Sequence, residues 1–241
     1  MGILEEKFRR DLGLRGLRPG TIDNYARCCR RFVMHFKRSP LELSVADVRA
    51  YLEHLRVREH KAPPSVNVYA AALAALFGET LGRRDEIGRI PRLRVRAKLP
   101  AVLSGSEVER VISALTSARQ RAVVMTMYGA GLRVGEARAL RIDDVDSRRM
   151  QLRVSCGKGG RERLVPLSPR LLEELRAYYR RYRPKGPLLF PGRDRNGQLA
   201  RAGISKAVGI AARKTGLGKR VSPHTMRHCY ATHLLDLGTD L

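Results

Sequence analysis

The sequence predicts a two-domain, mainly α-helical chain, in which an all-α domain is followed by a mixed α/β domain with a small antiparallel sheet. Three observations support this fold class. Apolar residues recur at helical spacing along most of the 241 residues, and a basic stretch with two prolines divides the chain. Apolar and polar residues alternate strictly at residues 150–155, and an apolar run follows at 164–167. With 43% hydrophobic residues, each domain can bury a core.

Residues 1–82 are predicted to form a small all-α domain with short turns. One helix should begin near Thr21, because a Pro-Gly pair interrupts the preceding segment. Ser44 is the expected N-cap of a second helix, and Ser65 is that of an alanine-rich third helix that ends near residue 78 or 82. The polar face of the first of these helices carries three basic residues, Arg27, Arg30 and Arg31.

Residues 83–100 hold seven basic residues and two prolines but almost no apolar periodicity. This composition is typical of an exposed linker between domains. A basic linker can also follow a phosphate backbone, where its contacts add affinity without reading the base sequence. The candidate backbone contacts are Arg92, Arg94 and Arg96.

Residues 101–241 are predicted to form the second domain. Ser104 or Ser106 should cap its first helix, and a second apolar helix is expected from about residue 121 to 128. The alternating residues 150–155, a glycine-rich turn at 157–160 and an apolar run at 164–167 together indicate a β-hairpin. Helices are then expected at Pro169–Tyr182, Ile204–Thr215 and Pro223–Leu237.

The chain carries 48 lysine and arginine residues against 23 aspartate and glutamate residues, a formal charge of +25. Both halves of the chain share this surplus, so both domains are expected to contact a polyanion. A charge of this size favours nucleic acid as the partner, although ribosomal proteins and proteins of membrane surfaces are also basic. Charge alone therefore predicts a class of partner and not an activity.

The four cysteines, Cys28, Cys29, Cys156 and Cys229, show neither CxxC nor Cys/His ligand spacing. We therefore expect neither a disulfide framework nor a zinc site, and no other metal or cofactor. No apolar run approaches the roughly 18 residues that span a bilayer, and the first ten residues lack the apolar core of a signal peptide. These features predict a cytoplasmic protein without a membrane partner.

Residues 222–228, Ser-Pro-His-Thr-Met-Arg-His, form the most informative segment. Ser222 is a good N-cap and Pro223 a good first helical residue, so the helix start is well defined. His224 and Arg227 are three residues apart and share a face in the first turn, where free backbone amides and the helix dipole favour an anion. The pair predicts a phosphate site, whereas an isolated HxxR is more often two solvated surface residues.

Two further segments hold candidates for the same site. Arg133 opens a helix and shares a face with Glu136, whose carboxylate can orient the guanidinium group. Lys158 stands in the hairpin turn, from which a flexible cation can reach a phosphate or protonate a leaving oxygen. Each also has an ordinary interpretation, the first as a surface salt bridge of little energetic weight and the second as a solubilising lysine.

Taken together, GLRxxEA, then GKGGRER with LVPL, then SPHTMRH with CYATHLL resemble in order and spacing the catalytic domain of the tyrosine recombinase or phage integrase family. The segment LPAVLS at 99–104 and the TIxxY helix near residue 21 are similar to the Xer and integron branches of that family. The resemblance covers nearly the whole chain. It implies a helical, SAM-like core-binding domain and a catalytic domain that together clamp duplex DNA. The candidate DNA contacts of the first domain are Arg27, Arg30 and Arg31.

By motif position, the resemblance also implies roles for six residues. These are Arg133 and Arg227 on the scissile phosphate, Lys158 as general acid, His224 as proton shuttle, and Glu136 and His228 as supporting partners. Strand exchange would proceed through a covalent 3′-phosphotyrosine. A tetramer of the full-length protein would assemble on DNA.

One departure from the family concerns the nucleophile. The family pattern continues past GTDL with a helix, a further His or Trp and the nucleophilic tyrosine, whereas this sequence stops at Leu241. Tyr230 matches a structural aromatic, so the 241-residue chain is expected to be truncated before its nucleophile and to bind DNA without cutting it. One alternative is a naturally truncated regulator of recombination, which differs only in where the gene ends. Another is a structural protein of a ribonucleoprotein particle, which would prefer RNA to duplex DNA.

Overall fold

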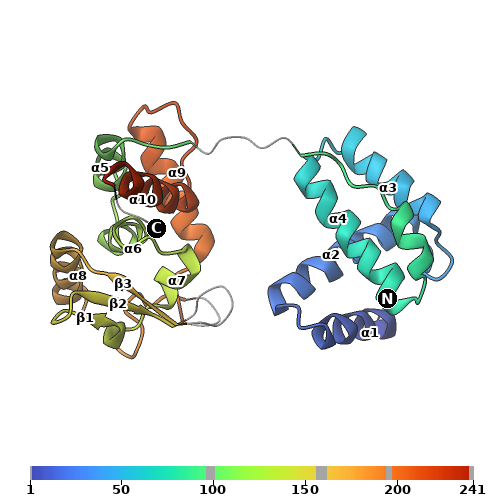
Figure 1. Cartoon of the computed structure of the whole chain (residues 1–241), viewed down its shortest axis with the longest axis horizontal. Helices are drawn as coiled ribbons and strands as arrows, with labels where there is room; N and C mark the ends of the chain where they lie inside the picture. The colour runs from blue at the N-terminus through green and yellow to red at the C-terminus, as the bar shows by residue number, and fades with distance from the viewer. Residues whose placement is uncertain (1, 96–100, 156–161, 194–196, 239–241) are drawn as a thin grey trace. The chain divides into compact units, whose positions relative to one another are not determined.

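A computed structural model describes residues 2–95, 101–155, 162–193 and 197–238 of the chain. The chain divides into two compact units, residues 1–98 and 99–241, each with its own hydrophobic core (Figure 1). The predicted fold class, mainly helical with one small antiparallel sheet, is confirmed. The predictions for Arg96, for Lys158 and for the turn around Lys158 concern residues outside the described ranges. No helix within those ranges is long and apolar enough to cross a bilayer.

The first unit is built around the packing of helix α2 against helix α4. Its helices are α1 (Gly2–Leu14), α2 (Pro19–Phe36), α3 (Val45–Val57) and α4 (Pro63–Ala75), followed by a π-helical turn (Leu76–Thr80) and a 3₁₀ turn (Arg84–Arg89). Phe32 lies at the centre and meets the rings of Tyr51 and Phe77 edge-on, at centroid distances of 5.4 and 6.4 Å. Such edge contacts suit the quadrupoles of aromatic rings and fix the orientation of α2 within the unit.

The helix starts of the first unit follow two kinds of signal. Ser44 caps α3 as predicted, because its hydroxyl accepts a hydrogen bond from the Asp47 N–H while the Asp47 carboxylate accepts one from the Ser44 N–H. The other two helices begin earlier than predicted, at Pro19 by two residues and at Pro63 by three. Proline suits the first helical position because its φ is already near the helical value and it has no N–H to leave unpaired. Ser65 therefore lies inside the first turn of α4 and is not its cap.

The stretch predicted as an exposed linker, residues 83–100, is packed in its first part. Ile90 is buried, and Leu93 packs against the core of the first unit. The side chain of Asn67 on α4 donates to the Leu93 carbonyl and accepts from the Leu93 N–H, both at 2.8 Å. These bonds pair the backbone groups of a segment that lacks regular secondary structure. This part of the stretch therefore belongs to the first unit, which corrects the expectation of a wholly exposed linker.

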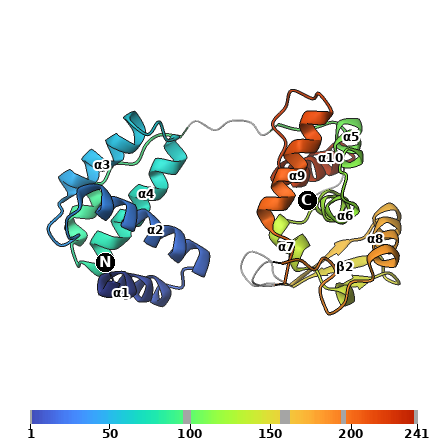
Figure 2. The same ribbon diagram turned by 180° about the vertical axis from the view of Figure 1, so that it is seen from behind.

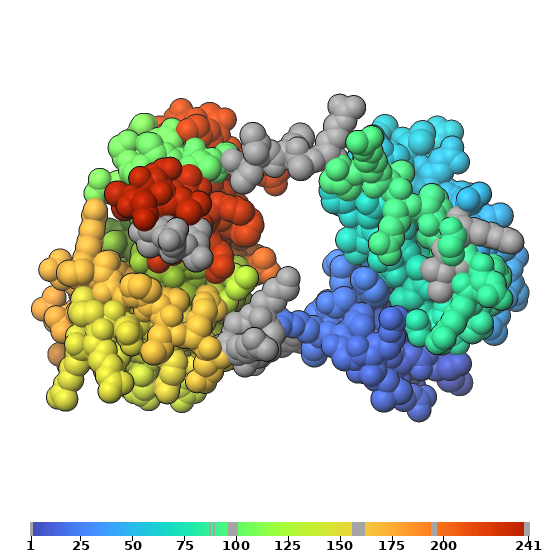
Figure 3. All heavy atoms as spheres, viewed as in Figure 1, coloured from blue at the N-terminus to red at the C-terminus, as the bar shows by residue number. Residues whose placement is uncertain are grey.

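The second unit has a buried helix at its centre. Its helices are α5 (Gly105–Ser113), α6 (Ala118–Gly129), α7 (Val134–Ala139), α8 (Pro169–Tyr182), α9 (Arg201–Lys214) and α10 (Pro223–Asp236). α6 packs against both α8 and α10 and contributes Val123, Val124 and Met127 to the core. Figures 1 and 2 show α7 between α9 and the sheet, and Figure 3 shows α10 at the surface of the unit.

The sheet of the second unit is antiparallel in the order β1, β2, β3, with bounds Val145–Asp146, Gln151–Val154 and Arg163–Pro166. The predicted alternation is confirmed for β2, since Leu152 and Val154 are buried while Arg153 is exposed. Val154 lies opposite Arg163 in the register of β2 and β3. Directly opposed residues point to the same face of a sheet, so Arg163 shares the face of a buried valine.

Three cysteines lie within the described residues, and all three are free and buried. Cys29 Sγ donates to the Ala72 carbonyl at 3.6 Å, and Cys229 Sγ accepts from the Leu103 N–H at 3.2 Å. Burial raises the pKa of the Cys29 thiol well above its usual value. Cys29 therefore packs as a small apolar residue and is not activated as a nucleophile.

Candidate active site

The start of α10 presents two of the predicted site residues. Ser222 caps the helix: its hydroxyl accepts from the Thr225 N–H, and the Thr225 hydroxyl accepts from the Ser222 N–H in return. Pro223 is the first helical residue. This reciprocal cap fixes the first turn, so that His224 and Arg227 leave the helix on one face.

The loop between α6 and α7 brings a second arginine to the same place. Gly131 has a φ of +61°, in the left-handed region, and turns the chain sharply after α6. Arg133 stands just before α7, and its N–H donates to Oε2 of Glu136 at 2.8 Å. Its side chain bonds the same carboxylate, from Nη1 to Oε1 at 2.9 Å. Glu136 therefore fixes both the backbone and the guanidinium group of Arg133.

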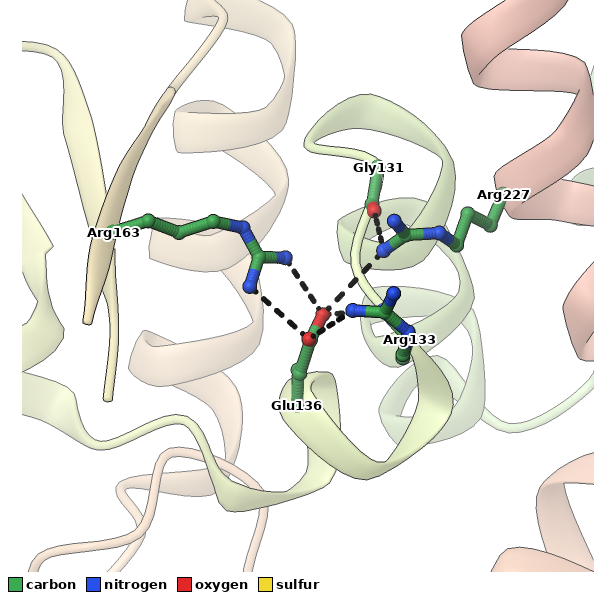
Figure 4. A network of polar contacts seen from close by, with 5 residues as sticks. All are labelled: Gly131, Arg133, Glu136, Arg163 and Arg227. Carbon is green, nitrogen blue, oxygen red and sulfur yellow. Dashed lines mark hydrogen bonds and ion pairs between the residues drawn. The ribbon is translucent and has the colours of Figure 1, made fainter. Parts of the chain in front are cut away.

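Two more arginines contact the Glu136 carboxylate (Figure 4). Arg163 on β3 donates from both terminal nitrogens, at 3.1 Å to Oε1 and 2.8 Å to Oε2. Arg227 Nη1 lies 3.6 Å from Oε2 and donates to the Gly131 carbonyl at 2.6 Å. The Glu136 side chain is only 3% exposed, so one buried carboxylate gathers guanidinium groups from three different elements.

The charges around Glu136 do not cancel. Burial opposes ionisation of the Glu136 carboxyl, but hydrogen bonds from Arg163 and from the backbone and side chain of Arg133 outweigh it and lower its pKa to about 2. The pKa of Arg227 is lowered from its usual value by burial and, next, by the charge of Arg133. The Glu136 carboxylate raises it, but not enough to offset these two effects. Three guanidinium groups around one carboxylate leave an excess of positive charge, which favours an anionic ligand.

A pocket of about 260 Å³ opens beside this cluster. It is lined by Met127, Arg133, Val134, Arg201, Ser205, Ser222, Pro223, His224 and Arg227. Three of the predicted site residues, Arg133, His224 and Arg227, are thus brought together in one hollow. The lining also contains Arg201 of α9, which the sequence patterns did not single out.

His224 and His228 form a pair on α10, with their Nε2 atoms 2.8 Å apart. A contact of this length needs one proton between the two nitrogens, so one ring donates while the other accepts. Burial, and next the neighbouring His228 and Arg227, lower the pKa of His224 from its ordinary value of 6.5. His224 is therefore neutral at pH 7 and able to accept a proton.

The low pKa of His224 leads to a testable expectation. In a pH titration followed by NMR, the His224 ring should titrate below an ordinary histidine, because burial and the neighbouring His228 and Arg227 oppose its protonation. Inorganic phosphate should shift this titration to higher pH, since an anion in the pocket stabilises the imidazolium form. An ordinary titration that phosphate leaves unchanged would show that His224 does not share an anion site with the arginines.

The arginines predicted as DNA contacts of the first unit are exposed on α2 but differ in their partners. Arg31 donates to the Glu59 carboxylate and to the Tyr69 hydroxyl, each at 3.0 Å. Arg27 and Arg30 contact polar side chains of α2 and α1. Arg31 would have to exchange two partners to bind a phosphate, whereas Arg27 and Arg30 are held by one contact each among the described residues.

Arg163 was not among the residues predicted for the site, although the sequence carries a signal for it. The residue lies at a strand position that faces the interior, and a charged side chain there needs a buried partner. That partner, Glu136, is 27 residues away. The spacing of the sequence does not give the strand register that joins the two.

An all-α unit followed by a mixed α/β unit with an arginine-lined pocket is the organisation expected of a tyrosine recombinase. Residues 101–241 match the Phage integrase family, and residues 4–87 match the Phage integrase, N-terminal SAM-like domain. The chain therefore belongs to the phage integrase family.

Individual relatives agree with this placement. The chain is 38% identical over 244 residues to the putative integrase/recombinase y4qK of Sinorhizobium fredii, covering 100% of this chain and 78% of that relative. It is 34% identical over 240 residues to the tyrosine recombinase XerA of Thermococcus kodakarensis, covering 98% of this chain and 82% of that relative. The family is thus one of tyrosine-type site-specific recombinases, enzymes that process DNA.

Solved structures share the fold. A crystal structure of XerA recombinase matches with a TM-score of 0.54 and 25% identity, over 99% of this chain and 86% of that one. A lambda integrase dimer bound to a COC′ core site matches with a TM-score of 0.78 and 18% identity, over 100% of this chain and 91% of that one. At 18% identity the second likeness supports the fold alone.

Proposed function

We propose that this protein is a site-specific DNA recombinase that exchanges strands of duplex DNA through a covalent 3′-phosphotyrosine. The observation that carries the proposal is the convergence of Arg133, His224 and Arg227 on one pocket, with both arginines in contact with Glu136. Guanidinium groups pair with phosphate oxygens through forked hydrogen bonds, so this lining suits a phosphodiester. Membership of the phage integrase family supports DNA as the source of that phosphodiester.

The arginines would act on charge that develops during the reaction. When a nucleophile attacks phosphorus in line, negative charge builds on the non-bridging oxygens, and donors already held in place stabilise it without reorganisation. Arg133 and Arg227 have this role in the proposal. His224, neutral at pH 7, accepts the proton of the attacking hydroxyl and can share it with His228. The motif position of Lys158 assigns to it the protonation of the leaving 5′ oxygen.

The two units have different proposed roles, DNA binding for the first and catalysis for the second. We assign residues 1–82, together with the packed first part of residues 83–100, to a core DNA-binding domain, the rest of that basic stretch to a linker and residues 101–241 to the catalytic domain. The family matches at 4–87 and 101–241 support this division. Arg92 and Arg94 support the backbone-contact role of the linker, because both are exposed on either side of the packed Leu93.

The nucleophile would not be one of the tyrosines described in the second unit, and none of them lines the pocket. The Tyr128 hydroxyl is hydrogen-bonded to His233, and the Tyr178 hydroxyl is buried. The ring of Tyr230 occupies the space beside Gly131, as expected of a structural aromatic. We therefore propose that none of these tyrosines is the nucleophile and that the 241-residue polypeptide binds DNA without forming the covalent intermediate.

Assembly and location are part of the same proposal. Exchange between two duplexes needs several active sites at once, which favours a homotetramer on DNA; one lambda integrase structure that shares this fold is a tetramer bound to a Holliday junction. Action on chromosomal or phage DNA implies a cytoplasmic location. The alternative, a naturally truncated DNA-binding regulator of recombination, shares the fold and the DNA contacts and differs from the recombinase only in where the gene ends.

Binding to duplex DNA tests the proposal directly. We expect steep salt dependence, because the chain has a formal charge of +25 and each neutralised phosphate adds about −0.9 to the slope of log affinity against log salt. Fluorescence anisotropy of a labelled duplex at several salt concentrations measures this slope. Arg92→Ala and Arg94→Ala should each lower affinity for all sequences alike and reduce the slope by about 1.

The control for these variants is Arg15→Ala, which removes the same charge from an arginine paired with Glu79. It should change the slope less than either linker variant. A preference for RNA over duplex DNA, or binding that salt does not weaken, would contradict the proposal and favour a ribonucleoprotein component.

A further inference from the structure

Arg163 is a charged residue on the face of the sheet that covers the core. It lies on β3 opposite Val154, which is 2% exposed, so its side chain points to the face that covers the core. The Arg163 side chain is 35% exposed, so its guanidinium group loses part of its solvation, which charged or hydrogen-bonding partners offset. Arg163 meets this requirement through both oxygens of Glu136.

The contact of Arg163 with Glu136 differs in kind from those of the other arginines. Arg163 forms a two-bond fork, at 3.1 and 2.8 Å, whereas the Arg133 guanidinium makes one bond and Arg227 approaches only to 3.6 Å. The terminal torsion of a glutamate side chain has broad preferences, so a carboxylate held at a single point can turn. A planar fork on both oxygens fixes the plane of the carboxylate.

The orientation of this carboxylate decides where the other two arginines lie. Oε1 accepts from the Arg133 side chain, and Oε2 accepts from the Arg133 N–H and faces Arg227. If the carboxylate turned, Arg133 would lose its alignment with the pocket and Arg227 would keep only its bond to the Gly131 carbonyl. Arg163 itself is absent from the lining of the pocket that Arg133 and Arg227 share.

We propose that Arg163 is a positioning residue, which locks the Glu136 carboxylate so that Arg133 and Arg227 are preorganised to hold one phosphate group. The proposal rests on the proposed function in taking that phosphate to be the scissile phosphate of DNA. Arg163 acts through Glu136 and does not touch the substrate. Its effect is therefore on the geometry of the anion site and not on the number of DNA contacts.

The chain offers a matched control on the neighbouring strand. Arg153 of β2 donates from Nε to Asp144 at 3.1 Å, and the Asp144 side chain is 3% exposed, as is that of Glu136. Neither Arg153 nor Asp144 lines the pocket. Changes at Arg153 therefore alter the charge to the same extent as the matching changes at Arg163 and perturb an ion pair to an equally buried carboxylate, without touching the proposed site.

The test compares Arg163→Lys and Arg163→Gln with Arg153→Lys and Arg153→Gln in the 241-residue chain. Inorganic phosphate serves as the probe, and the Nε–Hε NMR signals of Arg133 and Arg227, assigned through Arg133→Lys and Arg227→Lys, report its binding. We expect both Arg163 variants to weaken phosphate binding by about tenfold and to move the two signals toward those of solvent-exposed arginines, since lysine keeps the charge but cannot form the fork. The Arg153 variants should leave the signals and the affinity unchanged.

Two further measurements separate positioning from simple loss of structure. In a Glu136→Gln background, Arg163→Gln should weaken phosphate binding no further, because Arg163 affects phosphate binding only through the Glu136 carboxylate. Thermal unfolding of Arg163→Lys and Arg153→Lys shows whether the two variants are equally folded. Phosphate binding by Arg163→Lys that equals wild type, or an equal loss in Arg153→Lys, would overturn the proposal.

This experiment contains no DNA, so its failure is distinct from failure of the proposed function. If the chain binds duplex DNA but the Arg163 variants bind phosphate as tightly as wild type, the recombinase proposal stands and the positioning role is refuted. If the Arg163 variants lose phosphate affinity but the wild-type chain does not bind duplex DNA, the positioning role is supported and DNA is refuted as the source of the phosphate.

Discussion

Replacing Arg227 with alanine is expected to lower strand cleavage by about 100- to 1,000-fold while lowering affinity for duplex DNA by less than about tenfold. The difference follows from when the side chain acts. A group that binds charge present only in the transition state contributes to the rate, whereas the many phosphate contacts of a basic chain determine affinity. Arg227 is one of 48 basic residues but one of few that line the pocket.

The position of Arg227 is specified by contacts that alanine cannot replace. Its Nη1 donates a hydrogen bond to the Gly131 carbonyl at 2.6 Å and lies near Glu136. The remaining N–H groups of the guanidinium fork can therefore bind a ligand. Because the side chain is anchored at one end, it needs little reorganisation when charge develops on a phosphate. Loss of a single preorganised donor of this kind has a large effect on rate.

Cleavage is measured with a nicked suicide duplex and a polypeptide extended through the tyrosine segment of the family pattern, by scoring a slow-migrating, protease-sensitive DNA band. Arg170→Ala is the control, because it removes the same charge from an exposed arginine paired with Glu109. It should affect cleavage and binding little. Equal losses of binding and cleavage in Arg227→Ala would instead make Arg227 an ordinary DNA contact.

Local sequence signals located the helices well where a side chain caps the helix and less well where proline begins it. Ser44 and Ser222 cap helices in the predicted way, since each cap is a contact with a residue three positions on. Thr21 and Ser65 were poor markers, because proline two residues earlier already had the helical φ. The predicted strand alternation held for β2, whereas the two-residue β1 has too little pattern to predict.

The packed part of the linker was missed for a different reason. Its basic, proline-containing composition is typical of exposed segments, and Ile90 and Leu93 are too few to form a periodic pattern. What holds the segment in place is the Asn67 side chain, 26 residues before Leu93. Composition describes a segment but does not include partners that fold against it.

The same limit applies to the site. Arg133 with Glu136, and His224 with Arg227, are each three residues apart, so helical geometry alone predicts that the members of each pair share a face. The joining of the two pairs through Gly131, and the contribution of Arg163, depend on contacts over 96 and 27 residues. Spacing cannot give such contacts. Only the family resemblance, which carries tertiary information, led to the grouping of Arg133 with Arg227.

Gly131→Ala is expected to destabilise the second unit by about 2–4 kcal/mol. Gly131 has a φ of +61°, which costs alanine about 1–2 kcal/mol. An added Cβ would also lie 2.4 Å from two atoms of the Tyr230 ring, closer than carbon atoms can approach. Since the Gly131 carbonyl accepts the hydrogen bond of Arg227, any shift that relieves the overlap also displaces Arg227. Stability and cleavage should therefore fall together.

Gly135→Ala is the matched control, a glycine-to-alanine change four residues away in the same segment. Nothing lies within 4 Å of the added Cβ, and the residue is inside α7. Alanine there should raise the free energy of unfolding by about 0.5–1 kcal/mol, as glycine is the poorer helix former. Urea unfolding of both variants measures the two opposite effects.

A second change separates the two sources of the loss at Gly131. Tyr230→Leu removes the ring that the added Cβ would meet and leaves the backbone conformation unchanged, so the double variant Gly131→Ala/Tyr230→Leu should lose less stability than the two single losses added together. Additive losses would assign the whole effect to the left-handed backbone. A Gly131→Ala chain within about 0.5 kcal/mol of wild type would show that the α6–α7 loop can shift freely, and that the Gly131 carbonyl does not fix Arg227.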